Sequence, residues 1–171
     1  MNYQIHQQPQ GRASFSARTG AAAQRDWLSR RTRGEHDMLL EAMHRLEASL
    51  SSPAPGREGP WSGRVAHELR PVRDYLRLHV ESAEGAEGLC RELEAARPEL
   101  AYRVEQVRME HAKLLEMATA LARSVEPAET LADFPSIRQR AADLLATIRS
   151  HYAREVDLIY ECFCTDIGVG D

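Results

Sequence analysis

The sequence predicts an all-α protein, an antiparallel up-down four-helix bundle, from three observations. Ala, Leu, Glu and Arg dominate the long middle of the chain, and aromatic residues make up only 6% of it, a composition that favours helix over sheet. Segments that carry proline or glycine interrupt the chain at three places. Between these breaks, apolar residues recur at steps of three or four, which is the spacing of one face of a helix.

The chain of 171 residues has the length of about one domain, so we expect one core and one site. Residues 1–33 are predicted to form an N-terminal arm that is mostly irregular, because their first part is rich in Gln, Gly, Ser and Arg and lacks an apolar period. The bundle is predicted over residues 34–171.

The breaks divide this region into four helical runs. Residues 51–63 contain three prolines and three glycines and are predicted to be a surface loop. Further breaks are expected at residues 85–88 and 126–135, and Pro98 is well placed to open a helix as a first-turn residue. Pro71 lies inside the second run, which predicts either a kink there or a helix that begins near it.

Each run places one histidine within its apolar stripe: His36, His79, His111 and His151. The other members of the stripes are Leu39, Leu40, Met43, Leu46 and Leu50 in the first run; Val65, Leu69, Val72, Leu76 and Ala83 in the second; Leu100, Val104, Val107, Leu114, Ala118 and Leu121 in the third; Ile137, Ala141, Leu144, Ile148, Leu158 and Cys162 in the fourth. Four such amphipathic helices with short connections bury their stripes against one another.

Glu155 also falls in the stripe of the fourth run, one turn after His151. A carboxylate in a core costs several kcal/mol unless it is paired or binds a metal. A single histidine on an apolar face is more often a hydrogen-bonded core residue than a ligand, but four of them with a glutamate favour a metal centre. Imidazole and carboxylate ligands suit iron, manganese or zinc rather than copper(I).

Two divalent ions would need a second core carboxylate to balance their charge. Position 83, one turn after His79, is alanine. Glu84 lies five residues after His79, about 500° around the helix, and therefore about 140° away from it unless the helix loosens near Gly85. We assign Glu84 as the second carboxylate ligand and leave open that Glu81, or no carboxylate of this helix, has the role.

The sequence resembles the hemerythrin HHE cation-binding family, whose pattern is histidine, His-x-x-x-Glu, histidine and again His-x-x-x-Glu, one element per helix. The segments that carry the resemblance are EHDMLLEAMHRLE at His36, LRLHVESAEG at His79, VRMEHAKLLEMA at His111, and HYAREVDLIYE at His151 and Glu155. The sequence departs from the family at Ala83, where the family has a glutamate. It also has Leu115 where oxygen-carrying hemerythrins place a further histidine.

The resemblance implies a non-haem di-iron centre, of which an oxo or hydroxo bridge can be part, that binds or senses O2, NO, peroxide or redox state. The expected ligands are His36, His79, Glu84, His111, His151 and Glu155. One alternative is a di-iron enzyme that acts on peroxide or nitric oxide. The other is a metal-free helical interaction module, which the departure at Ala83 keeps open. The sequence does not decide whether the protein is an enzyme.

Other residues of the chain have structural interpretations. Glu35 and Glu110 each precede a core histidine and are expected to be solvated or to hydrogen-bond to ligands rather than to bind metal. His44, at the edge of its stripe, is a weaker candidate for either role. Cys162 and Cys164 are two residues apart on a helix and face opposite sides, so we assign them to helix-end packing.

Charge and composition exclude several functional classes. The net charge is -4, with 22 basic and 26 acidic residues interspersed, so no nucleic-acid or membrane partner is expected. The start has no signal-peptide core, no apolar run approaches the length of a membrane span, and three cysteines suggest free thiols, so we expect a cytoplasmic protein. The sequence leaves the oligomeric state open.

Overall fold

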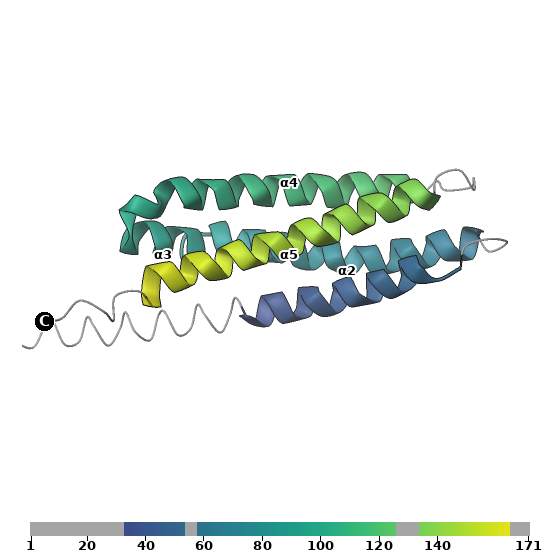
Figure 1. The fold of residues 1–171 in the computed structure, drawn as a ribbon, viewed down its shortest axis with the longest axis horizontal. Helices are drawn as coiled ribbons and strands as arrows, with labels where there is room; N and C mark the ends of the chain where they lie inside the picture. The colour runs from purple at the N-terminus through teal and green to yellow at the C-terminus, as the bar shows by residue number, and fades with distance from the viewer. Residues whose placement is uncertain (1–32, 54–57, 126–133, 165–171) are drawn as a thin grey trace, which may run out of the picture. The chain divides into compact units, whose positions relative to one another are not determined.

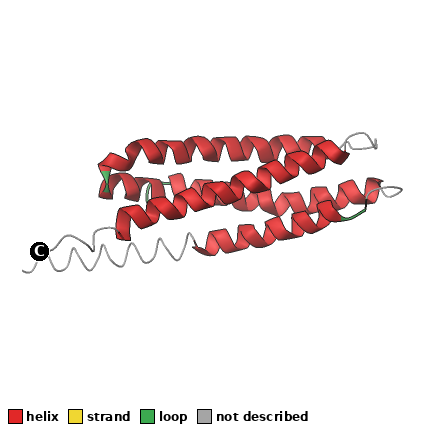
Figure 2. Cartoon of the chain, in the orientation of Figure 1, coloured by secondary structure: helices red, strands yellow, loops and turns green. Residues whose placement is uncertain are grey.

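The computed structural model describes residues 33–53, 58–125 and 134–164. These residues form a first helix over residues 33–51, then α2 (Glu58–Glu84), α3 (Leu89–Ala96), the 3-10 helix η1 (Pro98–Leu100), α4 (Ala101–Val125) and α5 (Phe134–Cys164). No strand occurs within these ranges (Figure 2). The prediction of an all-helical bundle is confirmed.

The four long helices lie side by side and the chain reverses its direction between each and the next (Figure 1). Helix α4 packs against both α2 and α5. The first helix contributes Leu39, Met43 and Leu46, all fully buried, to the core that it shares with α2, α4 and α5. This is the antiparallel up-down arrangement that the short connections predict.

The predicted stripes form the core of the bundle. Every predicted apolar position is buried except Leu40, which is partly buried and packs against the core. Full burial of one such leucine or isoleucine side chain stabilises the fold by about 1.5–3 kcal/mol. In α2, α4 and α5, the stripe histidine lies between residues of a large apolar cluster and residues of a smaller one around α3. The imidazoles therefore occupy a polar layer between two apolar layers.

The start of α2 differs from the predicted loop over residues 51–63, because the helix already begins at Glu58. Pro60 lies in its first turn, where a missing N–H leaves no helical hydrogen bond unmade. Trp61 is fully buried and meets Phe134 edge-on, with ring centroids 4.7 Å apart. Burial of the Trp61 ring stabilises a helical turn in a segment whose composition predicts a loop.

Helix α2 also continues through Pro71, so it does not begin near that residue. Proline has no N–H, and the helix lacks one backbone hydrogen bond at that turn. The predicted break at residues 85–88 is present, and Pro98 opens η1, which leads into α4. The short helix α3 between them was not predicted. Gly88 precedes it, and a side chain there would collide with the carbonyls of Ser82 and Ala83.

The predicted N-terminal arm lies, apart from residue 33, outside the described residues and stays a prediction. Among the helices described, none is long and apolar enough to cross a membrane.

Candidate metal centre

Five polar side chains meet in the core of the bundle. His36 comes from the first helix, His79 from α2, His111 from α4, and His151 and Glu155 from α5. The last four are 0–1% exposed, and His36 is 9% exposed. Five of the six predicted ligands are thus brought together, each from the helix whose stripe contains it.

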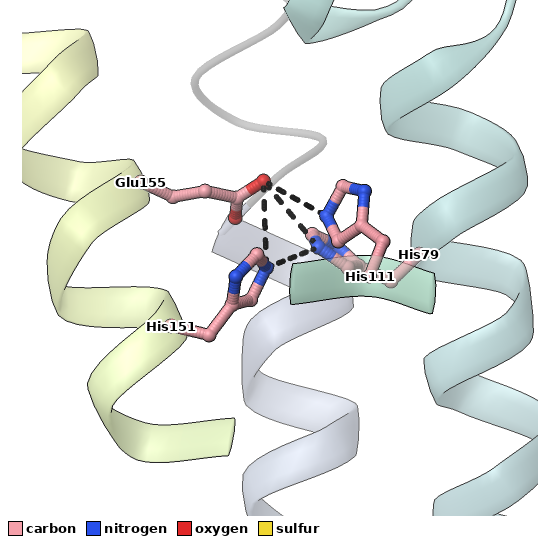
Figure 3. A group of neighbouring side chains, drawn as sticks. All are labelled: His79, His111, His151 and Glu155. Atoms are coloured by element: carbon pink, nitrogen blue, oxygen red, sulfur yellow. Dashed lines mark hydrogen bonds and ion pairs between the residues drawn. The ribbon is translucent and has the colours of Figure 1, made fainter. Parts of the chain in front are cut away.

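One oxygen of Glu155 faces three imidazoles (Figure 3). Glu155 Oε1 lies 3.4 Å from Nε2 of His79. It lies 3.8 Å from Nε2 of His111 and 3.9 Å from Nε2 of His151. The Nε2 atoms of His79 and His151 are 3.5 Å apart. Ligand atoms about 2.1 Å from a tetrahedral ion are about 3.4 Å from one another, so this group has close to the spacing of a metal site.

Unsatisfied atoms point to the same conclusion. Glu155 Oε1 and His111 Nε2 are buried and have no hydrogen-bond partner among the residues that the structure describes. Buried polar atoms in native proteins nearly always have a partner, and an orphaned pair in one cluster needs a physical reason. A cation between them would satisfy both atoms at once. The residues present therefore fit a bound divalent metal ion.

The second oxygen of Glu155 faces the other way. Its Oε2 lies 3.1 Å from Nε2 of His36. The His36 ring stacks on Tyr152, with centroids 3.7 Å apart and planes at 22°. The two oxygens of Glu155 thus serve two unequal sides of the centre, which we call the three-histidine side and the His36 side. A carboxylate placed in this way can bridge two ions.

Two of the three imidazoles are held from outside by hydrogen bonds to carboxylates. His111 Nδ1 lies 2.7 Å from Oε1 of Glu84, and His151 Nδ1 lies 2.9 Å from Oε2 of Glu110. Arg154 in turn holds Glu110 with its Nε 2.7 Å from Oε1. Such a partner fixes the Nδ1–H tautomer and leaves the Nε2 lone pair for a metal, as in most metal-binding histidines. The hydrogen-bonding role predicted for Glu110 is confirmed.

His79 is arranged less tightly, since its Nδ1 lies 3.8 Å from Oε2 of Glu35, beyond hydrogen-bonding range. Burial opposes a charge on this imidazole. The carboxylates of Glu155 and Glu35 outweigh burial and raise the pKa of His79 to about 9. In the metal-free protein at neutral pH, His79 therefore carries a proton that a metal ion must displace.

Burial also works against a charged Glu155, but the neighbouring histidines His111, His36 and His79 outweigh it and hold the pKa of Glu155 well below its usual value. The pKa of His151 is lowered, chiefly by burial. Glu155 is therefore an anion and His151 is neutral at pH 7, which are the forms that bind a metal.

Glu84 does not lie where the sequence analysis placed it. Its carboxylate contacts the outer nitrogen of His111 instead of joining the inward-facing atoms, and its side chain is 35% exposed. Helix α2 keeps its regular turn up to Glu84, so the residue stays about 140° from His79. Glu81 is exposed and pairs with Arg77, while Ala83 faces the core. Within its described length, α2 offers no carboxylate to the interior.

Tyr152 is a member of the site that the sequence analysis missed. Its side chain is buried, and its hydroxyl lacks a hydrogen-bond partner within the described ranges. Burial, followed by the charges of Glu155 and Glu35, raises the pKa of this phenol. The available signal was its position, since Tyr152 follows a core histidine and precedes Glu155 by three residues, which places both on one face of α5.

A groove on the surface reaches the His36 side. It has a volume of about 400 Å³, and its lining includes His36, Tyr152, Leu40 and Val156. Val156 is 53% exposed, and the groove is mostly apolar. The groove therefore lies against the His36 side of the centre.

The other histidines and the cysteines of the described ranges are not among the converging donors. His44 and His67 are exposed. Cys90 and Cys162 are buried. Burial raises the pKa of Cys90 to about 12, so the Cys90 thiol is not a reactive thiolate. The side chain of Cys164 lies outside the described residues.

Comparison with known proteins agrees with this geometry. The family model of the hemerythrin HHE cation binding domain matches residues 28–163, a span that includes all five core donors. Neither the curated proteins nor the solved structures gave a match. The family match covers well over half of the chain, and the chain belongs to the hemerythrin HHE cation binding domain family.

Proposed function

We propose that this protein is a non-haem iron protein that holds two ions with unequal strength and uses them to bind or sense O2, NO, peroxide or redox state. The observation that carries the proposal is the convergence of three imidazole nitrogens and one carboxylate oxygen in a buried layer of the bundle. Nitrogen and oxygen donors without an inward thiolate suit iron among the first-row metals. Iron bound there would supply open coordination positions and a change of oxidation state.

The three-histidine side supports a tight first ion. His79, His111, His151 and Glu155 each offer one ligand atom, and these atoms lie within 4.8 Å of one another. Two of the imidazoles are already oriented by outer carboxylates, so little conformational freedom is lost when an ion binds.

The His36 side supports a weaker second ion. Of the predicted ligands, only His36 and Oε2 of Glu155 face this side. Position 83 is alanine, and the Glu84 carboxylate is within hydrogen-bonding distance of His111 instead. Repulsion between two divalent ions at short range is strong in a medium of low dielectric constant, and a single carboxylate offsets only part of it. Solvent or a small ligand entering from the groove would have to complete the coordination.

Anaerobic titration of metal-free protein with iron(II), monitored by calorimetry, tests the proposal. We expect a tight first equivalent and a second that binds at least about tenfold more weakly. Exposure to air should then produce charge-transfer absorption in the near ultraviolet. Retention of less than about a fifth of an equivalent of any transition metal would overturn the proposal. Two equally tight equivalents would overturn the assignment of unequal sides.

A matched pair of variants tests the reason for the inequality. Ala83 is 4% exposed and lies one turn after His79, so Ala83→Glu should add a carboxylate to the centre and tighten the second ion. Ala86→Glu adds the same charge at an exposed position and should not. Equal tightening in both variants would show that general negative charge, rather than a missing ligand, limits the second ion.

A further inference from the structure

Tyr152 occupies a special place beside the candidate metal centre. It lies on α5 between two donors, directly after His151 and three residues before Glu155. Its ring stacks on His36, and its centroid is 5.5 Å from that of His79. The phenol therefore borders the side of the centre that has the fewest protein donors.

The hydroxyl of Tyr152 is buried, and within the described part of the chain it has no hydrogen-bond partner. A buried hydroxyl without a partner is unfavourable, and tyrosine hydroxyls in protein interiors usually find an acceptor. A phenol is ordinarily protonated at neutral pH, so this group has a proton to donate. The acceptor that it lacks is the kind of group that a small ligand would supply.

The surface groove lies beside this phenol. Tyr152 and His36 both line it, and His36 is the most exposed of the five core donors, at 9%. The remaining four are 0–1% exposed. The groove thus borders the Tyr152 ring on the side where the protein provides fewest ligands.

We propose that Tyr152 is a ligand-binding residue whose hydroxyl donates a hydrogen bond to a small anion or polar diatomic molecule held at the His36 side of the centre. This inference rests on the proposed function, because a ligand held there needs the metal. It assigns to the phenol a role in selecting ligands that accept a hydrogen bond, apart from the role of the five donors in holding the ion.

The role of the Tyr152 hydroxyl can be tested apart from the packing of its ring. Stacking against His36 fixes the plane of the ring, and this contact would be the same for phenylalanine. Substitution of Tyr152 by phenylalanine therefore removes the hydroxyl and keeps the aromatic ring. Any loss of ligand affinity in that variant can be attributed to the missing hydrogen bond.

The test uses azide as the probe on iron(III)-loaded full-length protein. The azide-to-iron charge-transfer band is titrated in the wild type, in Tyr152→Phe and in a matched control, Tyr160→Phe. Tyr160 is on the same helix but 63% exposed. Tyr152→Phe should weaken azide binding about tenfold or more, since hydrogen bonds to charged acceptors are among the strong ones. Tyr160→Phe should leave it unchanged.

Iron content and circular dichroism of each variant are measured first. Wild-type protein that retains no iron would overturn the proposed function and this inference with it. Equal iron content with equal azide affinity in wild type and Tyr152→Phe would overturn this inference alone. A visible tyrosinate-to-iron(III) band that disappears in Tyr152→Phe would also overturn it, because the phenol would then be a ligand rather than a donor.

Discussion

The two sides of Glu155 both offer imidazole and carboxylate donors, but they differ in how firmly neighbouring side chains hold those imidazoles. On the three-histidine side, Oε1 faces His79, His111 and His151, and outer carboxylates hold two of these rings in hydrogen-bonding range. On the His36 side, Oε2 faces one imidazole, which is held by stacking on Tyr152. The difference shows that one buried carboxylate can serve a well-organised position and an open one at the same time.

Removal of Glu155 should have the largest effect, because both sides depend on it. Glu155→Leu is expected to lower metal affinity by about a thousandfold or more. It should also destabilise the metal-free bundle by about 3–5 kcal/mol at neutral pH, because the protonated His79 then stays buried without its carboxylate partner. Metal content and thermal unfolding measure the two effects. Glu116→Leu on the exposed face of α4 is the control. Unchanged iron stoichiometry in Glu155→Leu would show that this glutamate is not a ligand.

Alanine variants of the histidines separate the two sides. His151→Ala should weaken the first ion by about a hundredfold or more, because it removes one of four donors and leaves Glu110 without its imidazole. His36→Ala should leave the first ion in place and abolish binding of the second. Calorimetric titration distinguishes the two outcomes. Equal loss of the first ion in both variants would contradict the division into two sides.

The pH dependence of metal binding reports on His79 and hence on the three-histidine side. Below about pH 9 the metal-free imidazole is protonated, since its pKa is raised to about 9. Metal binding must release this proton, so apparent affinity should fall about tenfold for each pH unit between pH 9 and pH 7 and level off above pH 9. Competition titrations at several pH values measure this slope. A flat profile over this range would show that His79 is not a ligand.

The smallest expected effect concerns Glu84, whose carboxylate contacts the outer ring nitrogen of His111. Glu84→Gln should weaken the first ion about tenfold and leave the number of bound ions unchanged, because Glu84 contacts the outer ring nitrogen. Metal stoichiometry and affinity are measured together, with the exposed Glu81→Gln as control. Loss of a whole equivalent of iron in Glu84→Gln would restore Glu84 to the ligand set.

The helices and the core histidines could be predicted because their positions follow directly from the period of the α-helix. Over a run such as α5, steps of three and four from Ile137 to Cys162 place His151 and Glu155 on the buried face whatever the neighbouring helices are. The start of α2 could not be predicted in this way, because the burial of Trp61 against Phe134 depends on a contact with another helix.

The same limit applies to Glu84 and Tyr152. The rotation of Glu84 away from His79 could be calculated, but its actual partner, His111, lies on α4 and becomes a neighbour only when the bundle forms. Tyr152 falls one position outside the stripe, and its contact with His36 joins the first helix to α5. Local periodicity identifies the residues of the polar layer, whereas tertiary packing decides which atom each one faces.

The donors come from four helices, and His36 and Glu155 are 119 residues apart in the chain. The two ions together would therefore act as a non-covalent cross-link: the first joins α2, α4 and α5, and the second joins the first helix to α5. A metal present at about a thousand times its dissociation constant adds about 4 kcal/mol to the free energy of unfolding. Loss of both ions would loosen all four helices together, so the lifetime of the folded chain against proteolysis would follow the supply of metal around it.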